Sequence, residues 1–401
     1  AKLALGGLPK SIWETYSSFA NTLGGLILLG VREERDKTLH PVELPDPERL
    51  IAEFWEIVND PMRTSVNILT SRDVYVQRAE GKRIIVIHVP RAQRFDRPVY
   101  LDGSTVNTYR RDGEGDYRCT RDEVTAMLRD AAARSQDMRV LEHAAPDALD
   151  AATVARYRAR MREVKPGHVW ETLGDRAFLE RAGALGTGED GAPHPTAAGL
   201  LMFGRACEIV REFPAYALEC RTEDGAALVS SSGDWSGNVY DFYTQAGARI
   251  ALGEDAKLRA AVREALANCL VNADYHGAQG VRVTRRAEGI VLENPGGFRV
   301  RPEAARAGGV SDPRNTGLMR MFAFVGAGSS SGRGIPHIYA VWRAHGWREP
   351  VIEERFHPER IVLTLPFEKA EGRMRLPHTE DASELIVAYL TDHVEADAAE
   401  I

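Results

Sequence analysis

The stretch 263–275, REALANCLVNADY, is the part of the sequence from which the fold and the function follow. Read as a helix, it places four apolar residues on one side: Ala265, Leu266, Cys269 and Leu270. The other side carries Glu264, Asn268 and Asn272, spaced four residues apart and therefore on one face. Asparagine is a mediocre helix former, because its side chain competes for backbone hydrogen bonds. A face with one carboxylate and two carboxamides therefore needs an explanation beyond helix formation.

Two further features supply the other parts that a nucleotide site needs. ENPGG, at 293–297, is expected at the end of a strand, and a glycine-rich run at 326–334 leads straight into a helix. A carboxylate can activate water, and a carboxamide oxygen can bind Mg²⁺. The N–H groups of a glycine loop at a helix start can hold phosphate, and a glycine turn lets a base approach closely. The three parts together predict a nucleotide site.

Each part taken alone has a simpler structural explanation. Polar residues spaced four apart are most often a solvated helix face, and Asn-Pro-Gly-Gly is most often only a turn. Runs of glycine and serine are commonly flexible linkers. The order and spacing of all three parts together is much more specific for a nucleotide site than any one part alone. We therefore predict a nucleotide site.

The order of these parts resembles the GHKL ATP-binding fold, which is shared by histidine kinases, gyrase, the Hsp90 chaperone and the MutL mismatch-repair protein. The closest branch is the one found in bacterial transcriptional regulators. That branch reads R-E-A-hydrophobic-x-N-A-x-x-H-R-D-Y, then N-P-G-G, then R-N, then G-x-G-I. This chain has the helix motif at 263–275, NPGG at 294–297, RN at 314–315 and GRGI at 332–335.

The resemblance implies roles for individual residues. Glu264 would be the water-activating base and Asn268 the ligand of Mg²⁺. The expected ATP contacts are Asn268, Asn272, Asn294, Gly296, Gly297, Gly326, Gly328, Gly332 and Gly334. Within this set, 294–297 would form the adenine turn, and the last four glycines would form the lid and phosphate loop. The implied cofactors are ATP and Mg²⁺, with a weak Mg²⁺-dependent ATPase activity whose turnover stays open.

Two positions depart from the family pattern. Asn272 stands where the bacterial branch usually has histidine. Asn294 stands where the wider superfamily has the aspartate that binds adenine, but an amide can donate as well as accept a hydrogen bond. These two substitutions also motivate an alternative, in which the protein is a binding scaffold whose nucleotide site has decayed.

The first 130 residues resemble the Schlafen-type AlbA-like domain. The resemblance rests on LPKSIWETYSSFANTLGGLILLGV at 8–31 and PVYLDGSTVNTYRRDGEG at 98–115. It implies nucleic-acid binding, and the Schlafen relatives include RNA-cleaving enzymes built on clustered carboxylates. Glu33, Glu34 and Asp36 could hold a metal ion in that way or could form a solvated turn.

Arginines are concentrated between 90 and 121. Five of them form the predicted nucleic-acid-binding set: Arg91, Arg94, Arg97, Arg110 and Arg111. Arginine-rich hairpins can grip phosphates. The alternative is a solvated surface on which the arginines pair with the acids of the same segment.

The pattern of expected helices and strands predicts an α/β (α+β) fold class. A length of 401 residues fits two to three domains. We expect an AlbA-like α/β domain at 1–135, a connecting domain at 136–255 and a GHKL-like α/β sandwich at 256–367. The tail at 368–401 contains SELIVAYLTDHV, which would be the first helix of a winged helix. Near the N-terminus, Asn21 is expected to end a helix in a left-handed conformation.

Composition narrows the class of protein. The longest apolar run, 23–31, is interrupted by glycines and is far too short to cross a bilayer. The four cysteines form no C-x-x-C pair and are interpreted as reduced thiols of a cytoplasmic, bacterial protein. The net charge of -7 gives no global signal for nucleic acid. No membrane partner is expected.

The predicted function is that of a transcriptional regulator that binds nucleic acid, with DNA as the expected target. ATP binding by the C-terminal module would modulate DNA binding or the oligomeric state, for instance that of a homodimer. Two alternatives stay open. One is a Schlafen-like metal-dependent nuclease regulated by ATP, and the other is the scaffold with a decayed site.

Overall fold

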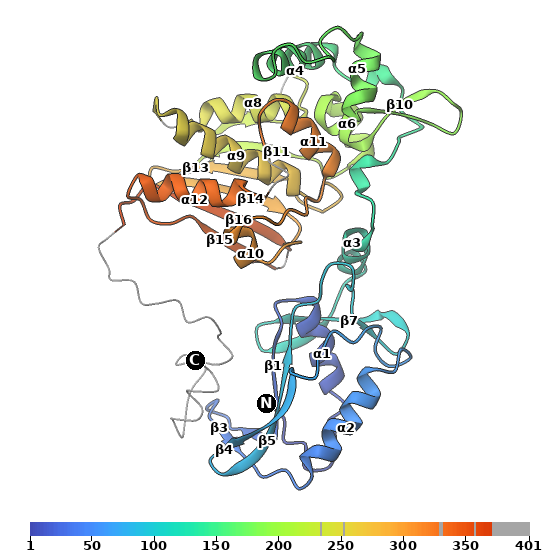
Figure 1. Ribbon diagram of the computed structural model, residues 1–401, viewed down its shortest axis with the longest axis vertical. Coiled ribbons are helices and arrows are strands. Elements are labelled where there is room, and N and C mark those ends of the chain that lie inside the picture. Colours follow the sequence, from blue (N-terminus) through green and yellow to red (C-terminus); the bar gives the residue numbers. More distant parts are fainter. Residues whose placement is uncertain (233–234, 252, 329–331, 357, 371–401) are drawn as a thin grey trace. The chain divides into compact units, whose positions relative to one another are not determined.

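The structure is a computed structural model that describes residues 1–232, 235–251, 253–328, 332–356 and 358–370. Over this part the chain separates into unit 1, Ala1–Ala131, and unit 2, which begins at Ala132 (Figure 1). Helices and strands are mixed in both units, so the predicted α/β class is confirmed. Among the described helices, none is both long and apolar enough to cross a membrane. The expected helix at 383–394 lies outside the described residues.

Unit 1 consists of small antiparallel sheets and the helices packed on them. Its elements are α1 (Ile12–Asn21), β1 (Gly25–Leu29), β2 (Val31–Glu33), β3 (Leu39–Pro41), α2 (Pro47–Val58), β4 (Val74–Ala79), β5 (Lys82–Val89), β6 (Tyr100–Leu101), β7 (Ser104–Asp112), β8 (Gly115–Arg118) and α3 (Arg121–Ala131). The strand orders are β1-β5-β4 and β6-β7-β8, beside the hairpin β2-β3. In the core, the rings of Trp13 and Phe54 stack at 5.3 Å, which joins α1 to α2.

Asn21 has a different role from the one expected. It is the last residue of α1, and its side chain is buried. Its Nδ2 donates to the carbonyls of Val99 at 2.9 Å and Tyr109 at 3.0 Å, and its Oδ1 accepts from the N–H of Val99 at 2.8 Å. The amide therefore fastens the helix to distant segments, because buried backbone groups need partners.

Asp116 on β8 anchors the β7–β8 hairpin to α1. It accepts hydrogen bonds from Thr15 Oγ1 at 2.6 Å, Ser18 Oγ at 2.5 Å and Arg111 Nη1 at 3.0 Å. Burial alone would raise the pKa of this carboxyl, but the hydrogen bonds outweigh burial and hold the pKa below its ordinary value. The ionised carboxylate is thus the form that stabilises unit 1.

We expect acid to weaken this anchor. Because the folded pKa of Asp116 is lowered, its contribution is present above the ordinary carboxyl pKa of about 3.9 and is lost as the pH falls through the folded value. Asp116→Asn should cost about 1–2 kcal/mol of unfolding free energy at pH 7 and almost nothing near pH 2. Urea unfolding followed by circular dichroism at both pH values measures the difference. An equal loss at both would contradict the assignment.

Unit 2 is built on one mixed sheet. Its strands are β11 (Leu218–Thr222), β12 (Ala227–Ser230), β13 (Val281–Arg285), β14 (Gly289–Pro295), β15 (Val351–Arg355) and β16 (Arg360–Pro366). The order among the described residues is β12-β11-β13-β14-β16-β15. The pair β11–β13 is parallel and the other pairs are antiparallel. Segments on either side of residue 255, where a domain boundary was expected, thus share one sheet.

Helices α8 and α9 pack on this sheet, and α12 packs on α9. The helices of unit 2 in the described residues are α4 (Ala151–Val164), α5 (Asp175–Ala182), α6 (Ala197–Phe203), α7 (Ala206–Glu212), α8 (Val239–Arg249), α9 (Ala256–Asn272), α10 (Pro302–Ala307), α11 (Thr316–Phe324) and α12 (Gly334–Ala344). The short pieces are η1 (Gln136–Met138), η2 (Pro146–Ala148), β9 (Leu185–Thr187) and β10 (Pro193–Pro195). Helices α9 and α12 pack side by side (Figure 1). Helix α9, which carries the polar stripe, begins after the cap Asp255 and ends at Asn272, three residues before the end of the quoted stretch.

Candidate functional site

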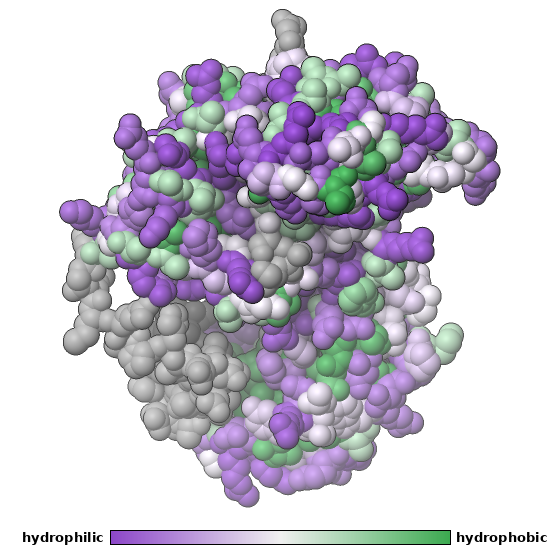
Figure 2. All heavy atoms as spheres, turned by 45° about the horizontal axis from the view of Figure 1, so that its top comes forward, coloured by the Kyte–Doolittle hydropathy of each residue, from purple (hydrophilic) through white to green (hydrophobic). Residues whose placement is uncertain are grey.

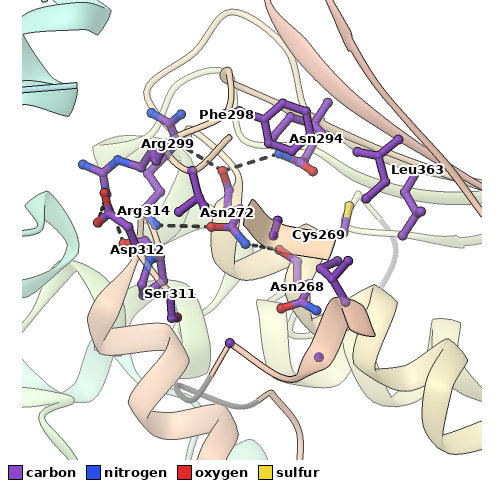
Figure 3. Close-up of a pocket in the computed structure, with 18 of the residues that line it drawn as sticks. Asn268, Cys269, Asn272, Asn294, Phe298, Arg299, Ser311, Asp312, Arg314 and Leu363 are labelled. Carbon is purple, nitrogen blue, oxygen red and sulfur yellow. Dashed lines mark hydrogen bonds and ion pairs between the residues drawn. The ribbon is translucent and has the colours of Figure 1, made fainter. Parts of the chain in front are cut away.

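A cavity of about 140 Å³ lies in unit 2 between α9, the end of β14 and the segments that precede α11 and α12 (Figure 3). Six of the predicted residues line it: Asn268, Asn272, Asn294, Gly297, Gly332 and Gly334. The helix stripe, the Pro-Gly-Gly turn and the glycine-rich segment therefore face one space. Gly296, Gly326, Gly328 and Glu264 lie outside this lining set.

Glu264 sits where the glycine-rich segment meets the start of α12. Its Oε2 accepts a hydrogen bond from the N–H of Gly328 at 3.0 Å. A Cβ added to Gly334 would overlap Glu264 Oε1 and would lie 3.0 Å from Asn268 Nδ2. Glycine at 334 thus lets the first turn of α12 approach the carboxylate and the carboxamide together. This contact brings the predicted base and the predicted metal ligand to one helix N-terminus.

Asn268 has one end of its amide available to a ligand. Its Nδ2 is buried and has no hydrogen-bond partner among the described residues. Turning the amide by 180° would place its oxygen at the same point. A buried polar atom without a partner is unfavourable by about 1–3 kcal/mol. The arrangement therefore fits a missing hydrogen-bonding or metal-binding group, as a nucleotide with Mg²⁺ would supply.

Asn294 forms the wall at the end of β14. Its side chain is only 4 % exposed, and its Nδ2 donates to the carbonyls of Asn272 and Pro295, both at 3.4 Å. Figure 3 shows this nitrogen directed at Asn272. The amide nitrogen therefore faces two carbonyls at long hydrogen-bond distance, which leaves Oδ1 as the group that a base would meet.

The two glycines of the turn are required by neighbouring side chains. Gly296 has φ +92°, which favours glycine, and a Cβ there would lie 2.7 Å from Arg314 Nη2. A Cβ on Gly297 would overlap the carboxylates of Glu354 and Glu359. From the sequence, these glycines were expected to let a base approach closely. In the structure, the groups that approach them are side chains of the chain itself, namely Arg314, Glu354 and Glu359.

Arg314 is a site residue that the sequence marked only as part of the RN motif, without a role. Its Nε donates to the carbonyl of Asn272 at 3.1 Å and its Nη2 to that of Gly297 at 2.9 Å. The next residue, Asn315, donates from Nδ2 to the carbonyls of Val271 and Ala273, both at 2.8 Å. The pair joins the end of α9 to the Pro-Gly-Gly turn. The RN motif was its only sequence signal, and it gave no role for either residue.

A second arginine reaches the same cavity. Arg299 lies largely buried in the lining, donates to the carbonyl of Pro313 at 3.0 Å and lies 3.9 Å from Asp312.

Cys269 faces the cavity from α9, and burial raises the pKa of its thiol far above the ordinary value. A thiol that stays protonated is a poor nucleophile, so Cys269 contributes apolar surface.

The four glycines assigned to the lid and phosphate loop separate into two pairs. Gly332 and Gly334 line the cavity, whereas Gly326 packs toward Val164 and Gly328 toward Met319. Gly326, Gly328 and Gly332 all have positive φ values, between +67° and +74°. The serines between the two pairs lie outside the described residues.

Two arginines of the predicted phosphate grip serve the structure of unit 1. Arg94 Nη1 donates to the carbonyl of Asp130 at 2.6 Å, near the end of α3. Arg97 is only 6 % exposed, so its guanidinium presents little surface to a phosphate, and its role in nucleic-acid binding stays a prediction. Arg91 is half-buried.

The other two arginines pair with acids. Arg110 Nε lies 3.0 Å from Glu123, and Arg111 binds Asp116, as described above. The alternative given for this segment was that its arginines pair with nearby acids, and both Arg110 and Arg111 do so.

One face of the molecule has polar side chains with small apolar patches scattered between them (Figure 2).

The acids at 33–36 do not converge. Glu33 lies 3.6 Å from Lys37, and Asp36 accepts from the N–H of Thr38 at 3.1 Å. Over the described ranges, no group of three or more His, Cys, Asp or Glu side chains could hold a metal ion. The four cysteines are free thiols.

Comparison with protein families gives three matches. Residues 3–120 match the family described as "Schlafen, AlbA_2". Residues 278–364 match "Putative ATP-dependent DNA helicase recG C-terminal". Residues 125–219 match a "Domain of unknown function (DUF8451)". No curated protein matches the chain.

Two solved structures are similar in part. The DIP2311 protein from Corynebacterium diphtheriae is 19% identical, with 90% of this chain and 72% of that chain covered and a TM-score of 0.46. The N-terminal domain of a putative ATP-dependent DNA helicase RecG-related protein from Nitrosomonas europaea is 29% identical, with 30% and 80% covered and a TM-score of 0.24. By its family matches, this chain joins a Schlafen AlbA_2-like region to an ATPase-like module similar to the recG C-terminal family.

Proposed function

We propose that unit 2 binds ATP together with Mg²⁺ in the cavity beside α9, and that unit 1 binds nucleic acid, with DNA as the expected target. Nucleotide binding would modulate nucleic-acid binding or oligomeric state, as in a transcriptional regulator. The observation that carries the proposal is the meeting of Asn268, Asn294 and Gly334 around one space. The two family matches support the same pairing of an ATPase-like with an AlbA-like part.

The phosphate end of the ligand belongs at the start of α12. The N-terminus of an α-helix attracts anions, because its first N–H groups are unpaired and the helix dipole is positive there. Gly334 is the first residue of this helix, and Asn268 lies beside it. A Mg²⁺ ion at this point would supply positive charge that offsets the charge of the phosphates. Asn268 would hold it through its amide oxygen, and Glu264 is the neighbouring carboxylate that could orient water.

The base belongs at the end of β14. With its Nδ2 facing the carbonyls of Asn272 and Pro295, Asn294 offers Oδ1 as an acceptor. The exocyclic amino group of adenine can donate to such an oxygen, whereas the carbonyl of guanine at the equivalent position would repel it. Asn294 can therefore select adenine as an aspartate would, but without the negative charge.

Calorimetric titration of the full chain with ATP, with and without Mg²⁺, tests the proposal. We expect saturable binding that tightens with Mg²⁺. Asn268→Ala should weaken Mg²⁺-dependent binding by about tenfold or more, because a ligand of the metal and the phosphates is removed. Asn107→Ala in unit 1, whose amide makes only a 3.4 Å contact with Leu101, is the matched control. Absence of binding by the unaltered chain at millimolar Mg²⁺-ATP would refute the function.

A further inference from the structure

The first residues of unit 2 make an ordered contact with the cavity wall. Ser135 Oγ lies 2.7 Å from the carbonyl of Arg314, to which it donates, and accepts from the N–H of Thr316 at 3.2 Å. Its Oγ is also 2.5 Å from Asp137 Oδ1. Ser135 follows directly on the segment that leaves unit 1, which ends at Ala131.

Asp137 caps a helix to which it does not belong. It is only 3 % exposed, and its Oδ2 accepts from the N–H of Leu318, in the first turn of α11, at 3.0 Å. The residue at the N-cap position of α11, Asn315, makes no capping bond, because its amide is used on the end of α9. A carboxylate is the preferred group at a helix N-terminus. Asp137, in the segment that follows unit 1 in the chain, therefore provides the N-terminal cap of α11.

Arg314 contacts both Ser135 and the residues that line the cavity. Its carbonyl receives Ser135, while its guanidinium holds Asn272 and Gly297, which line the cavity. The start of α11 lies between these two sets of bonds. A ligand that packs against Arg314 thus acts on a hydrogen-bonded unit that includes the segment between the two units of the chain.

We propose that Ser135 and Asp137 form a clasp that couples nucleotide occupancy of the cavity to the segment joining unit 1 and unit 2. The inference rests on the proposed nucleotide function. Ligand contact with Arg314 stabilises the start of α11 and hence the clasp. By thermodynamic reciprocity, an intact clasp strengthens nucleotide binding by the same factor. The clasp is the route by which the state of the cavity reaches the part of the chain that leads to unit 1.

Hydrogen exchange of the full chain, with and without saturating Mg²⁺-ATP, tests the coupling. We expect ATP to slow exchange of the amides of Thr316 and Leu318 by about fivefold or more, which is the lower end of typical allosteric coupling. Asp137→Ala should abolish this protection and weaken ATP binding by a similar factor. Asp137→Asn, which keeps an acceptor for Leu318 and gains a donor for Ser135, should retain most of both effects.

The outcomes distinguish the two proposals. If the unaltered chain binds ATP but exchange at 316–318 is unchanged and Asp137→Ala binds normally, the clasp is refuted and the nucleotide function stands. If the unaltered chain does not bind ATP, both fall. Ser135→Ala provides a second test should Asp137→Ala fold poorly. Exposed Asp147→Ala is the matched control and should change neither measurement.

Discussion

Substitution of Gly334 by valine is expected to weaken Mg²⁺-ATP binding by about 100-fold or more, equivalent to about 2.7 kcal/mol. A Cβ at this position overlaps Glu264 Oε1 and presses on Asn268 Nδ2. The side chains of both residues must then move, or the first turn of α12 must withdraw, and either change separates the phosphate-facing N–H groups from the carboxamide. Because the clash involves side-chain ends at a helix start, the fold of unit 2 should survive.

Gly174→Val is the matched control for this prediction. Gly174 stands just before α5, as Gly334 stands at the start of α12, but a Cβ there meets nothing within 4 Å. Calorimetry gives the affinity of both variants, and circular dichroism checks that they are folded. Normal ATP binding by a folded Gly334→Val variant would show that the ligand does not contact this helix start.

Trp342→Ala is expected to lower the free energy of unfolding of unit 2 by about 4–5 kcal/mol. Trp342 is fully buried on α12 and packs edge-on against Trp347 at 5.6 Å. Its Nε1 also donates to the carbonyl of Pro366 at 2.7 Å. Alanine leaves both a large cavity and a carbonyl without its donor, and these two costs act together.

Urea unfolding of the full chain measures this loss as a shift of the transition that belongs to unit 2. Trp342→Phe separates the two costs, since it fills most of the space but cannot reach Pro366 as a donor. The control is Val169→Ala, at a side chain 78 % exposed, which should stay within about 0.5 kcal/mol of the unaltered chain. A loss below 1 kcal/mol for Trp342→Ala would mean that α12 is not fixed to the sheet through this residue.

The parts of the site that depend on local spacing could be predicted from the sequence. Residues four apart on a helix share a face, so the stripe of Glu264, Asn268 and Asn272 follows from the helical period alone. A Pro-Gly-Gly turn is equally local. Arg314 and Arg299 were not predicted as site residues, because they reach the cavity through packing between segments far apart in the chain. The RN motif marks Arg314 but does not specify which segments it approaches.

The role of a charged or polar side chain depends on partners that local sequence does not specify. Arg97 and Arg110 look alike in the sequence, yet one is buried and the other meets an acid on α3. Asn21 likewise looks like a helix-ending residue, but its amide bonds to Val99 and Tyr109, about 80 to 90 positions away. Helix and turn positions were therefore easier to anticipate than the partners of polar groups.

The parallel pair of β11 with β13 has a consequence for anyone who dissects this protein. A truncated product that starts at residue 256 would lack β11 and β12, and it would carry a bare strand edge along β13. Exposed edges of this kind recruit other chains and cause aggregation. An insoluble fragment of that design would thus reflect the missing strands rather than an unstable nucleotide module, and cutting near residue 132 avoids the problem.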